Sequence, residues 1–123
     1  MSDNNELKIE KVIRPWGWYM TTFIGEGYKT KLFGVAPKHR LSLQSHNHRS
    51  EHWTIIKGTG VCTVGDQLID VTKDSFVRIP LQAKHRIENL SATDELLVAE
   101  VQMGDICEED DIIRYADDYN RAN

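Results

Sequence analysis

Cysteine and proline are scarce in this sequence of 123 residues, which has two cysteines and three prolines. Cys62 and Cys107 stand apart, without the CxxC spacing of zinc ribbons and redox motifs. A disulfide framework is therefore excluded, and we expect two free thiols in a reducing cytoplasm.

Long apolar runs and an excess of positive charge are also missing. The apolar runs are as short as the one from Leu96 to Ala99, which excludes a membrane-spanning helix. The polar, acidic first eleven residues lack the apolar segment of a secretory signal. The formal net charge of -4 is unlike the basic surface of nucleic-acid-binding proteins. The sequence predicts a cytoplasmic protein that binds neither membrane nor nucleic acid.

The sequence does contain a succession of short strand-like segments separated by turn signals. One such turn, Gly65-Asp66, is typical of a two-residue β-hairpin. Many short strands at regular spacing indicate an all-β sandwich or barrel. The expected strands are Trp18–Ile24, Tyr28–Ala36, Arg40–His46, His52–Lys57, Gly60–Val64, Gln67–Val71, Ser75–Ile79, His85–Glu88 and Glu95–Met103.

The length and the 40% of hydrophobic residues predict one domain over residues 1–123. Residues 1–13 are expected to form an N-terminal arm. Residues 105–123 are rich in Asp and Glu, and we expect them to pack on the barrel as a loop followed by a short helix or strand.

Polar side chains alternate along residues 40–48. On a strand, Arg40, Ser42, Gln44, His46 and His48 share one face. Burying five polar groups together is costly unless a metal, water or a polar ligand satisfies them. The alternative is that this face lies in solvent, and the strand alone leaves both readings open.

Residues 44–58 and 80–89 resemble the two sequence motifs of the cupin superfamily, whose fold is a double-stranded β-helix, or jelly-roll barrel. Three glycines of the family pattern are replaced here, by Lys38, Asp74 and Gln82. The resemblance implies a divalent metal, with zinc as the first choice and manganese, cobalt or iron as alternatives.

The first motif fits in two registers. Taking Gln44 and His46 as the first ligand pair leaves four residues before Glu51, as in the family, whereas His46 and His48 leave two. The resemblance therefore implies Gln44, His46, Glu51 and His85 as metal ligands, with His48 as a substitute or a supporting residue.

Residues 41–53, LSLQSHNHRSEHW, resemble the signature of type II mannose-6-phosphate isomerases, a domain often fused to a mannose-1-phosphate guanylyltransferase. Flanking segments such as RPWGWY at 14–19 and EDDIIR at 109–114 are also similar, so the resemblance covers residues 14–119. It implies a metal-dependent isomerase that interconverts mannose 6-phosphate and fructose 6-phosphate.

Four residues are expected to take part in that reaction. Arg40 would contact the enediolate or the phosphate. Glu100 would be the base, unless it is a surface carboxylate. Arg114 would hold the phosphate, as would Lys31, unless these are solvated charges.

Two other functions remain open at this stage. One is a non-catalytic sugar- or metal-binding cupin, accessory to polysaccharide or nucleotide-sugar synthesis; the other is a different sugar-phosphate or nucleotide-sugar isomerase. The expected partners are a small sugar phosphate and a second copy of the chain, because Leu41 and Leu43 present an apolar face that needs a cover.

Overall fold

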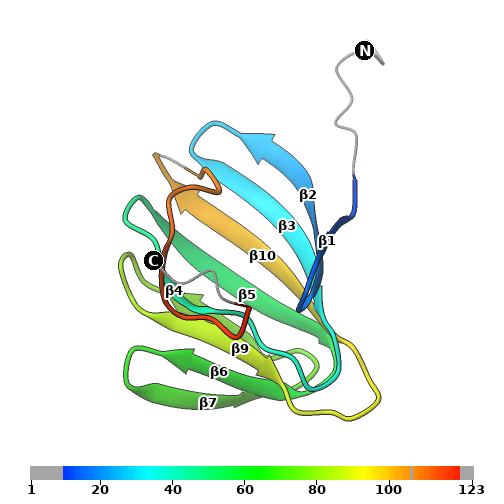
Figure 1. Ribbon diagram of the computed structural model, residues 1–123. Helices are drawn as coiled ribbons and strands as arrows, with labels where there is room; N and C mark the ends of the chain where they lie inside the picture. The colour runs from blue at the N-terminus through cyan, green and yellow to red at the C-terminus, as the bar shows by residue number, and fades with distance from the viewer. Residues whose placement is uncertain (1–9, 106, 120–123) are drawn as a thin grey trace.

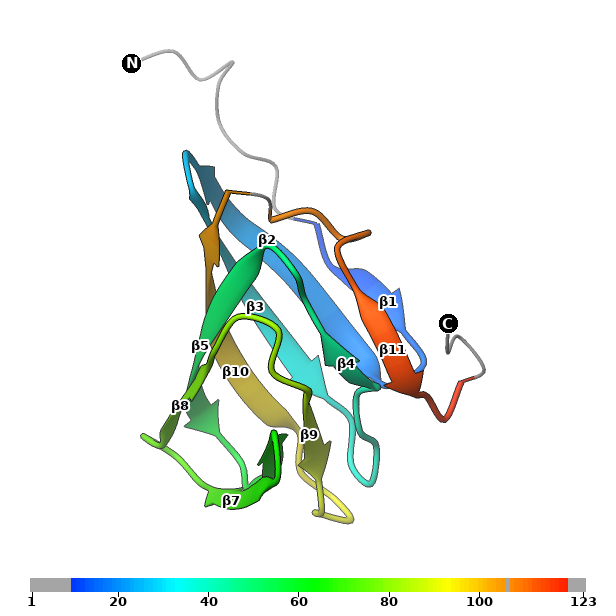
Figure 2. The same ribbon diagram turned by 90° about the vertical axis from the view of Figure 1, so that its left-hand side faces the viewer.

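Every regular element of the computed structural model, which describes residues 10–105 and 107–119, is a β-strand. The strands form two antiparallel sheets that face each other (Figures 1 and 2). One sheet has the order β1-β2-β3-β10-β5-β8 and the other β11-β4-β9-β6-β7. The prediction of an all-β fold is confirmed. The strands are β1 (Val12–Arg14), β2 (Gly17–Gly25), β3 (Tyr28–Val35), β4 (Leu43–Ser45), β5 (Arg49–Lys57), β6 (Gly60–Val64), β7 (Gln67–Val71), β8 (Phe76–Ile79), β9 (His85–Asn89), β10 (Leu96–Gly104) and β11 (Ile113–Ala116).

The hairpin predicted at Gly65-Asp66 is present, with Val64 paired to Gln67 and Gly65 at a φ of 58°. The strand predicted over Arg40–His46 is shorter than expected, because only β4 pairs as a strand there. Arg40 makes an isolated bridge with Glu88 instead. Ser42 is still buried, so Arg40 is the residue that leaves the predicted polar face at this end.

Of the two remaining strands, β1 was not predicted, whereas β11 is the strand alternative of the helix or strand expected within residues 105–123. β1 pairs with β2 at one edge of the larger sheet. β11 lies within the acidic C-terminal segment and pairs with β4 at an edge of the smaller sheet. This pairing brings the acidic segment beside the residues of the first cupin-like motif.

Three residues other than glycine adopt a left-handed backbone conformation. Lys38, Asp74 and Gln82 have φ values of 62°, 74° and 65°, and they are the non-glycine residues with positive φ in the described ranges. These are the three positions at which the cupin-like pattern has glycine. The turns are therefore kept although the glycines are not, at a conformational cost.

The barrel interior has an apolar end and a polar end. Along β10, the inward side chains change from Leu96 and Val98 to Glu100 and Gln102, all buried. The adjacent β5 runs antiparallel, and its inward residues change in the same direction in space, since Ile55 pairs with Val98 and residue 51 with residue 102. Charged and amide side chains thus gather at one level of the barrel.

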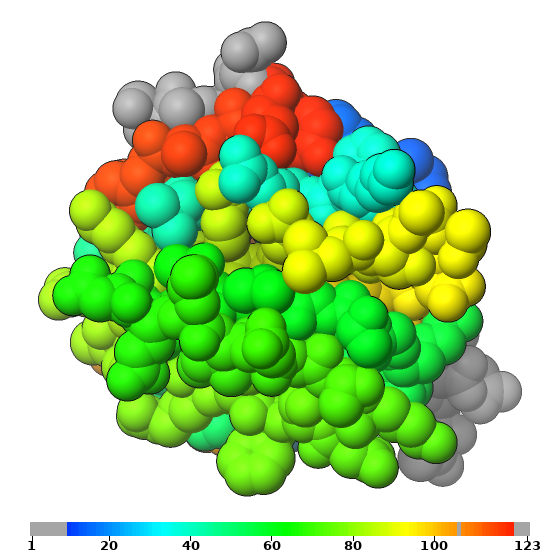
Figure 3. All heavy atoms as spheres, turned by 90° about the horizontal axis from the view of Figure 1, so that it is seen from below, coloured from blue at the N-terminus to red at the C-terminus, as the bar shows by residue number. Residues whose placement is uncertain are grey.

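The apolar end is closed by strands and turns. Figure 3 shows this end, where β6 and β7 (green) and the connection from β9 to β10 (yellow) lie side by side. Asn89 fixes that connection, since its amide donates to the carbonyls of Val35 and Asp94 at 2.9 and 2.8 Å. The polar end therefore carries the candidate site.

Other expectations concern the surface and the thiols. Cys62 and Cys107 are both free, as predicted. No helix in the described part of the chain is long and apolar enough to cross a membrane. Leu41 packs against the core, and Leu43 on β4 is half-buried. The homodimer itself stays a prediction.

Candidate metal centre

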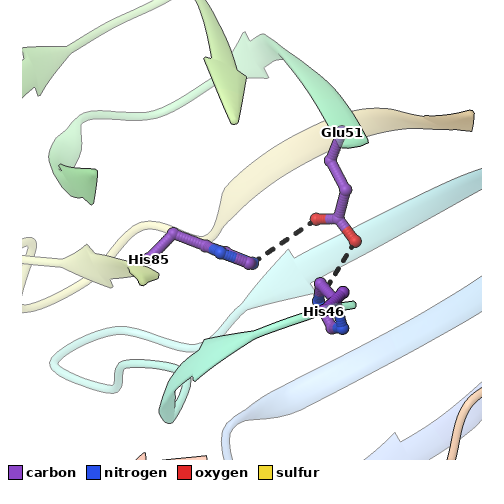
Figure 4. Close-up of side chains that lie close together, drawn as sticks. All are labelled: His46, Glu51 and His85. Atoms are coloured by element: carbon purple, nitrogen blue, oxygen red, sulfur yellow. Dashed lines mark ion pairs between the residues drawn. The ribbon is translucent and has the colours of Figure 1, made fainter. Parts of the chain in front are cut away.

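Two histidines and a glutamate meet between the two sheets. Glu51 comes from β5, His85 from β9, and His46 from the residue after β4 (Figure 4). The Nε2 atoms of His46 and His85 lie 3.3 and 3.6 Å from the two carboxylate oxygens of Glu51. All three residues are at most 3% exposed. Residues separated by up to 39 positions are therefore brought together as the motif resemblance implies.

Backbone carbonyls fix the tautomer of both rings. His46 Nδ1 lies 2.6 Å from the carbonyl oxygen of Asp111, and His85 Nδ1 lies 2.9 Å from that of Ala83. A carbonyl oxygen only accepts, so each Nδ1 must carry the proton and donate. Each neutral ring then presents an unprotonated Nε2 toward Glu51.

Burial keeps these rings neutral. Burial, with the nearby positive charge of Arg49, lowers the pKa of His46 to about 4. Burial also lowers the pKa of His85. Near neutral pH, two nitrogen lone pairs and a carboxylate therefore face one another.

This donor set fits a divalent metal ion. Two imidazole nitrogens and a carboxylate are a common ligand set for zinc, and their metal-facing atoms lie within 4.8 Å of one another. The hydrogen bonds from each Nδ1 to a carbonyl are the outer contacts that orient metal-bound histidines. The chain thus holds a group of residues that could bind a metal ion.

A cavity of about 170 Å³ adjoins the centre and shares Glu51 with it. Its wall combines cationic, acidic and aromatic side chains from both sheets, among them Lys31, Arg49, Arg114 and Tyr19. Lys31 is only 8% exposed; its Nζ lies 2.6 Å from Glu109 and 4.4 Å from the ring centre of Tyr19. Lys31 is therefore a buried wall residue, and the solvated alternative is wrong for it.

Glu100 faces inward from β10 and lines the same cavity, so the alternative of a surface carboxylate is wrong. Trp53 Nε1 and Gln102 Nε2 each donate to one of its oxygens at 2.8 Å. Burial, and then the charge of Glu51, raise the pKa of Glu100 to about 7. This carboxyl group can therefore be charged or neutral near physiological pH.

The remaining predicted residues occupy different positions. Gln44 lies on β4 directly opposite His85 and lines the cavity, while its amide nitrogen donates to Ser42 Oγ at 2.9 Å. His48 is exposed, lies outside the triad, and donates its backbone N–H to Asp111. The choice between Gln44 and His48 as a further ligand stays a prediction.

The structure places the predicted catalytic arginines differently. Arg114 lies on β11 and lines the cavity. Arg40 is not among the cavity residues, and its guanidinium makes two hydrogen bonds to Asp118 at 2.8 and 3.0 Å. Because the regular strand begins only at Leu43, Arg40 does not share the inward face that its predicted role required.

The sequence interpretation missed Arg49. This residue is 6% exposed, lines the cavity and donates to Glu51 at 2.9 Å. Its position two residues before Glu51 was the available signal, since alternate residues of a strand share a face.

Sequence comparison matches this chain to a protein family. The model described as "Mannose-6-phosphate isomerase C-terminal" matches residues 2–117. Xanthan biosynthesis protein XanB of Xanthomonas campestris pv. campestris (strain B100) is 41% identical over 112 residues, covering 91% of this chain and 24% of that protein. Mannose-1-phosphate guanylyltransferase of Escherichia coli (strain K12) is 39% identical over 112 residues, covering 91% of this chain and 23% of that protein. The chain therefore spans about a quarter of the length of these relatives.

A solved structure with a similar fold is the cupin-2 domain Rru_A2000 of Rhodospirillum rubrum. It has a TM-score of 0.71 and 20% sequence identity, over 84% of this chain and 78% of that one. At this identity the likeness concerns the fold, and it confirms the predicted cupin barrel.

The prediction that this chain interconverts mannose 6-phosphate and fructose 6-phosphate is wrong, because its relatives carry the names of a guanylyltransferase and a xanthan-synthesis protein. These names favour the alternative, a cupin that serves polysaccharide synthesis. The match over residues 2–117 and the cupin barrel establish that the chain belongs to the mannose-6-phosphate isomerase C-terminal family.

Proposed function

We propose that this chain is a metal-binding cupin that holds a phosphorylated sugar and serves polysaccharide or nucleotide-sugar synthesis as a non-catalytic module. The observation that carries the proposal is the convergence of two neutral imidazoles on Glu51 beside a cavity whose wall holds both cationic and acidic side chains. Zinc is the first choice of metal, with manganese, cobalt or iron as alternatives.

The wall chemistry supports a ligand with both an anionic group and hydroxyl groups. Lys31 and Arg114 line the cavity, and a guanidinium is well suited to a phosphate. The amide oxygen of Gln102 is buried and has no hydrogen-bond partner within the described residues. Because Gln102 uses its nitrogen for Glu100, its oxygen is available to accept from a ligand hydroxyl.

The cavity size favours a single sugar unit over a larger ligand. Its volume of about 170 Å³ is close to that of an engineered ~150 Å³ protein cavity that holds one benzene ring. A monosaccharide phosphate, with its phosphate at the charged wall, is therefore a better match than a whole nucleotide sugar.

The role in synthesis rests on the relatives. One is named for xanthan biosynthesis and another for guanylyl transfer to mannose 1-phosphate, and this chain matches about a quarter of each. A domain of this kind can supply sugar-phosphate binding to such a pathway.

Calorimetry with metal-loaded and chelator-treated protein tests the proposal. Mannose 1-phosphate or mannose 6-phosphate should bind to the loaded protein, whereas mannose without phosphate should bind at least about tenfold more weakly, the scale of one lost charged hydrogen bond. ³¹P NMR of the same mixtures should show no new phosphate ester. Equal binding of mannose, or conversion of the sugar phosphate, would contradict the proposal.

A second candidate function is an isomerase that acts on a different sugar phosphate or on a nucleotide sugar. The buried carboxyl group of Glu100 favours it, because a group with a pKa of about 7 can accept and return a proton near neutral pH. Deuterium uptake from solvent at a carbon of the sugar would support this candidate. Glu100→Gln should then abolish the uptake while the metal stays bound.

A further inference from the structure

Arg49 reaches the metal-facing atoms of the triad from the start of β5. Its Nε donates to Glu51 Oε2 at 2.9 Å, and its Nη2 lies 3.2 Å from His46 Nε2. Its Nη1 donates to the carbonyl oxygen of Glu108 at 2.9 Å. The guanidinium is therefore held at three points, two of which belong to the candidate metal centre.

The atoms that Arg49 uses are the atoms that a metal ion requires. His46 Nε2 has one lone pair, because its ring is neutral and its Nδ1 donates to Asp111. That lone pair can accept from a guanidinium N–H or bind a metal, but not both. A divalent ion and a guanidinium at the same carboxylate also repel each other strongly in a buried site.

We propose that Arg49 is an internal counter-cation that occupies the centre when no metal is bound and is displaced by the ion. This inference rests on the proposed metal site, where Arg49 competes with the metal ion for Glu51 and His46. The guanidinium donates to Glu51 and to His46, so it pairs the buried carboxylate and satisfies one of the two acceptor rings.

The displaced guanidinium has a place to go, because Arg49 also lines the cavity. Metal binding then moves a positive charge from the ligand atoms of Glu51 and His46 toward the space where an anion would bind. Metal and anion should therefore bind with positive coupling, each raising the affinity for the other.

The alternative role for Arg49 is to support metal binding. An arginine that orients Glu51 as a metal ligand would raise metal affinity, and its loss would lower the affinity about 10–100-fold. A competitor has the reverse effect. The sign of the change in metal affinity upon substitution of Arg49 therefore separates the two roles.

Cobalt titration followed by visible absorption measures this sign. Arg49→Gln should raise Co²⁺ affinity about tenfold or more, the scale of one charged hydrogen bond. Arg49→Lys keeps the charge but loses the planar guanidinium with its several N–H donors. This variant should also bind Co²⁺ more tightly than the natural chain. Arg14→Gln is the matched control: it removes a charge from the same cavity, where Arg14 contacts the ring of Tyr19, and should change the affinity less than about twofold.

Unchanged or weaker Co²⁺ binding by both Arg49 variants would overturn the inference while leaving the metal site in place. No Co²⁺ binding by the natural chain would instead overturn the proposed function, and this inference with it. Circular dichroism of each variant, recorded with and without Co²⁺, identifies a variant that fails to fold, in which case the other Arg49 variant decides.

Sulfate binding tests the coupling separately. In the natural chain, Co²⁺ should raise sulfate affinity about tenfold, and in Arg49→Gln this gain should disappear. If the gain persists in Arg49→Gln, the metal itself attracts the anion and the released guanidinium has no such role.

Discussion

The two histidines of the triad are oriented for a metal by backbone carbonyls, one distant in the sequence and one two residues away. Asp111 supplies the carbonyl for His46, and Ala83 supplies the one for His85. The carboxylate of Asp111 also accepts the backbone N–H groups of Asn47 and His48 at 3.0 Å. The acidic C-terminal segment therefore shapes the turn that carries His46.

The fourth metal ligand is a question about single residues. Gln44 lines the cavity opposite His85, whereas His48 is exposed. Gln44→Ala should therefore lower zinc affinity at least about tenfold, and His48→Ala should leave it within about twofold, as measured by competition with a chelating dye. The reverse order would show that His48 is the ligand.

The two thiols should differ in reactivity. Burial raises the pKa of the Cys62 thiol to about 12, and the side chain is fully buried. Cys107 is half-buried. At pH 8, iodoacetamide should modify Cys107 in the folded protein and Cys62 only after unfolding, as read by mass spectrometry of peptides. Equal labelling of both thiols in the folded protein would contradict this burial.

At the scale of elements, the turns of the barrel are kept by residues that fit them poorly. Lys38 is exposed and has a φ of 62°. Lys38→Gly should raise the free energy of unfolding by about 0.5–1 kcal/mol, because glycine adopts this conformation without strain. Urea unfolding measures the change.

Lys73→Gly is the control for that substitution. Lys73 also lies exposed in a turn, but it does not have a positive φ. The same chemical change should there lower stability by up to about 1 kcal/mol, through the greater freedom of the unfolded chain. If both variants lose stability equally, the left-handed turn at Lys38 is not strained.

Strand alternation and turn signals predicted most of the strands, because both are short-range patterns. The cupin resemblance implied His46, Glu51 and His85 as ligands, and Glu100 was expected as a base or as a surface carboxylate. The sequence did not predict the contact of Arg40 with Asp118 or that of Arg49 with His46, because both depend on the path of the folded backbone. Such pairings follow from the three-dimensional arrangement of the sheets.

On the scale of the whole molecule, the apolar core and the candidate binding site lie at opposite ends of the barrel. The apolar core fills one end, while buried charged, amide and imidazole side chains gather at the other end. Grouping buried charges is costly unless they are paired or bind an ion. Ligand binding at the polar end should therefore raise the free energy of unfolding more than further packing of the apolar core would.

Metal binding should stabilise the whole barrel, since the ligands come from both sheets. With free zinc at 100 times its dissociation constant, the free energy of unfolding should rise by about 2.7 kcal/mol. Excess chelator should remove this gain, and Glu51→Gln should not show it. Thermal unfolding with each addition measures the effect; a gain of equal size in Glu51→Gln would place the ion elsewhere.

His46, Glu51 and His85 are expected to hold one divalent ion. Crystals grown with zinc, with data collected above and below the zinc absorption edge, would locate that ion. One anomalous peak is expected about 2.0–2.2 Å from both Nε2 atoms and a carboxylate oxygen of Glu51, with the Arg49 guanidinium moved away from those atoms. An empty centre in zinc-saturated crystals, or a peak held by other residues, would contradict it.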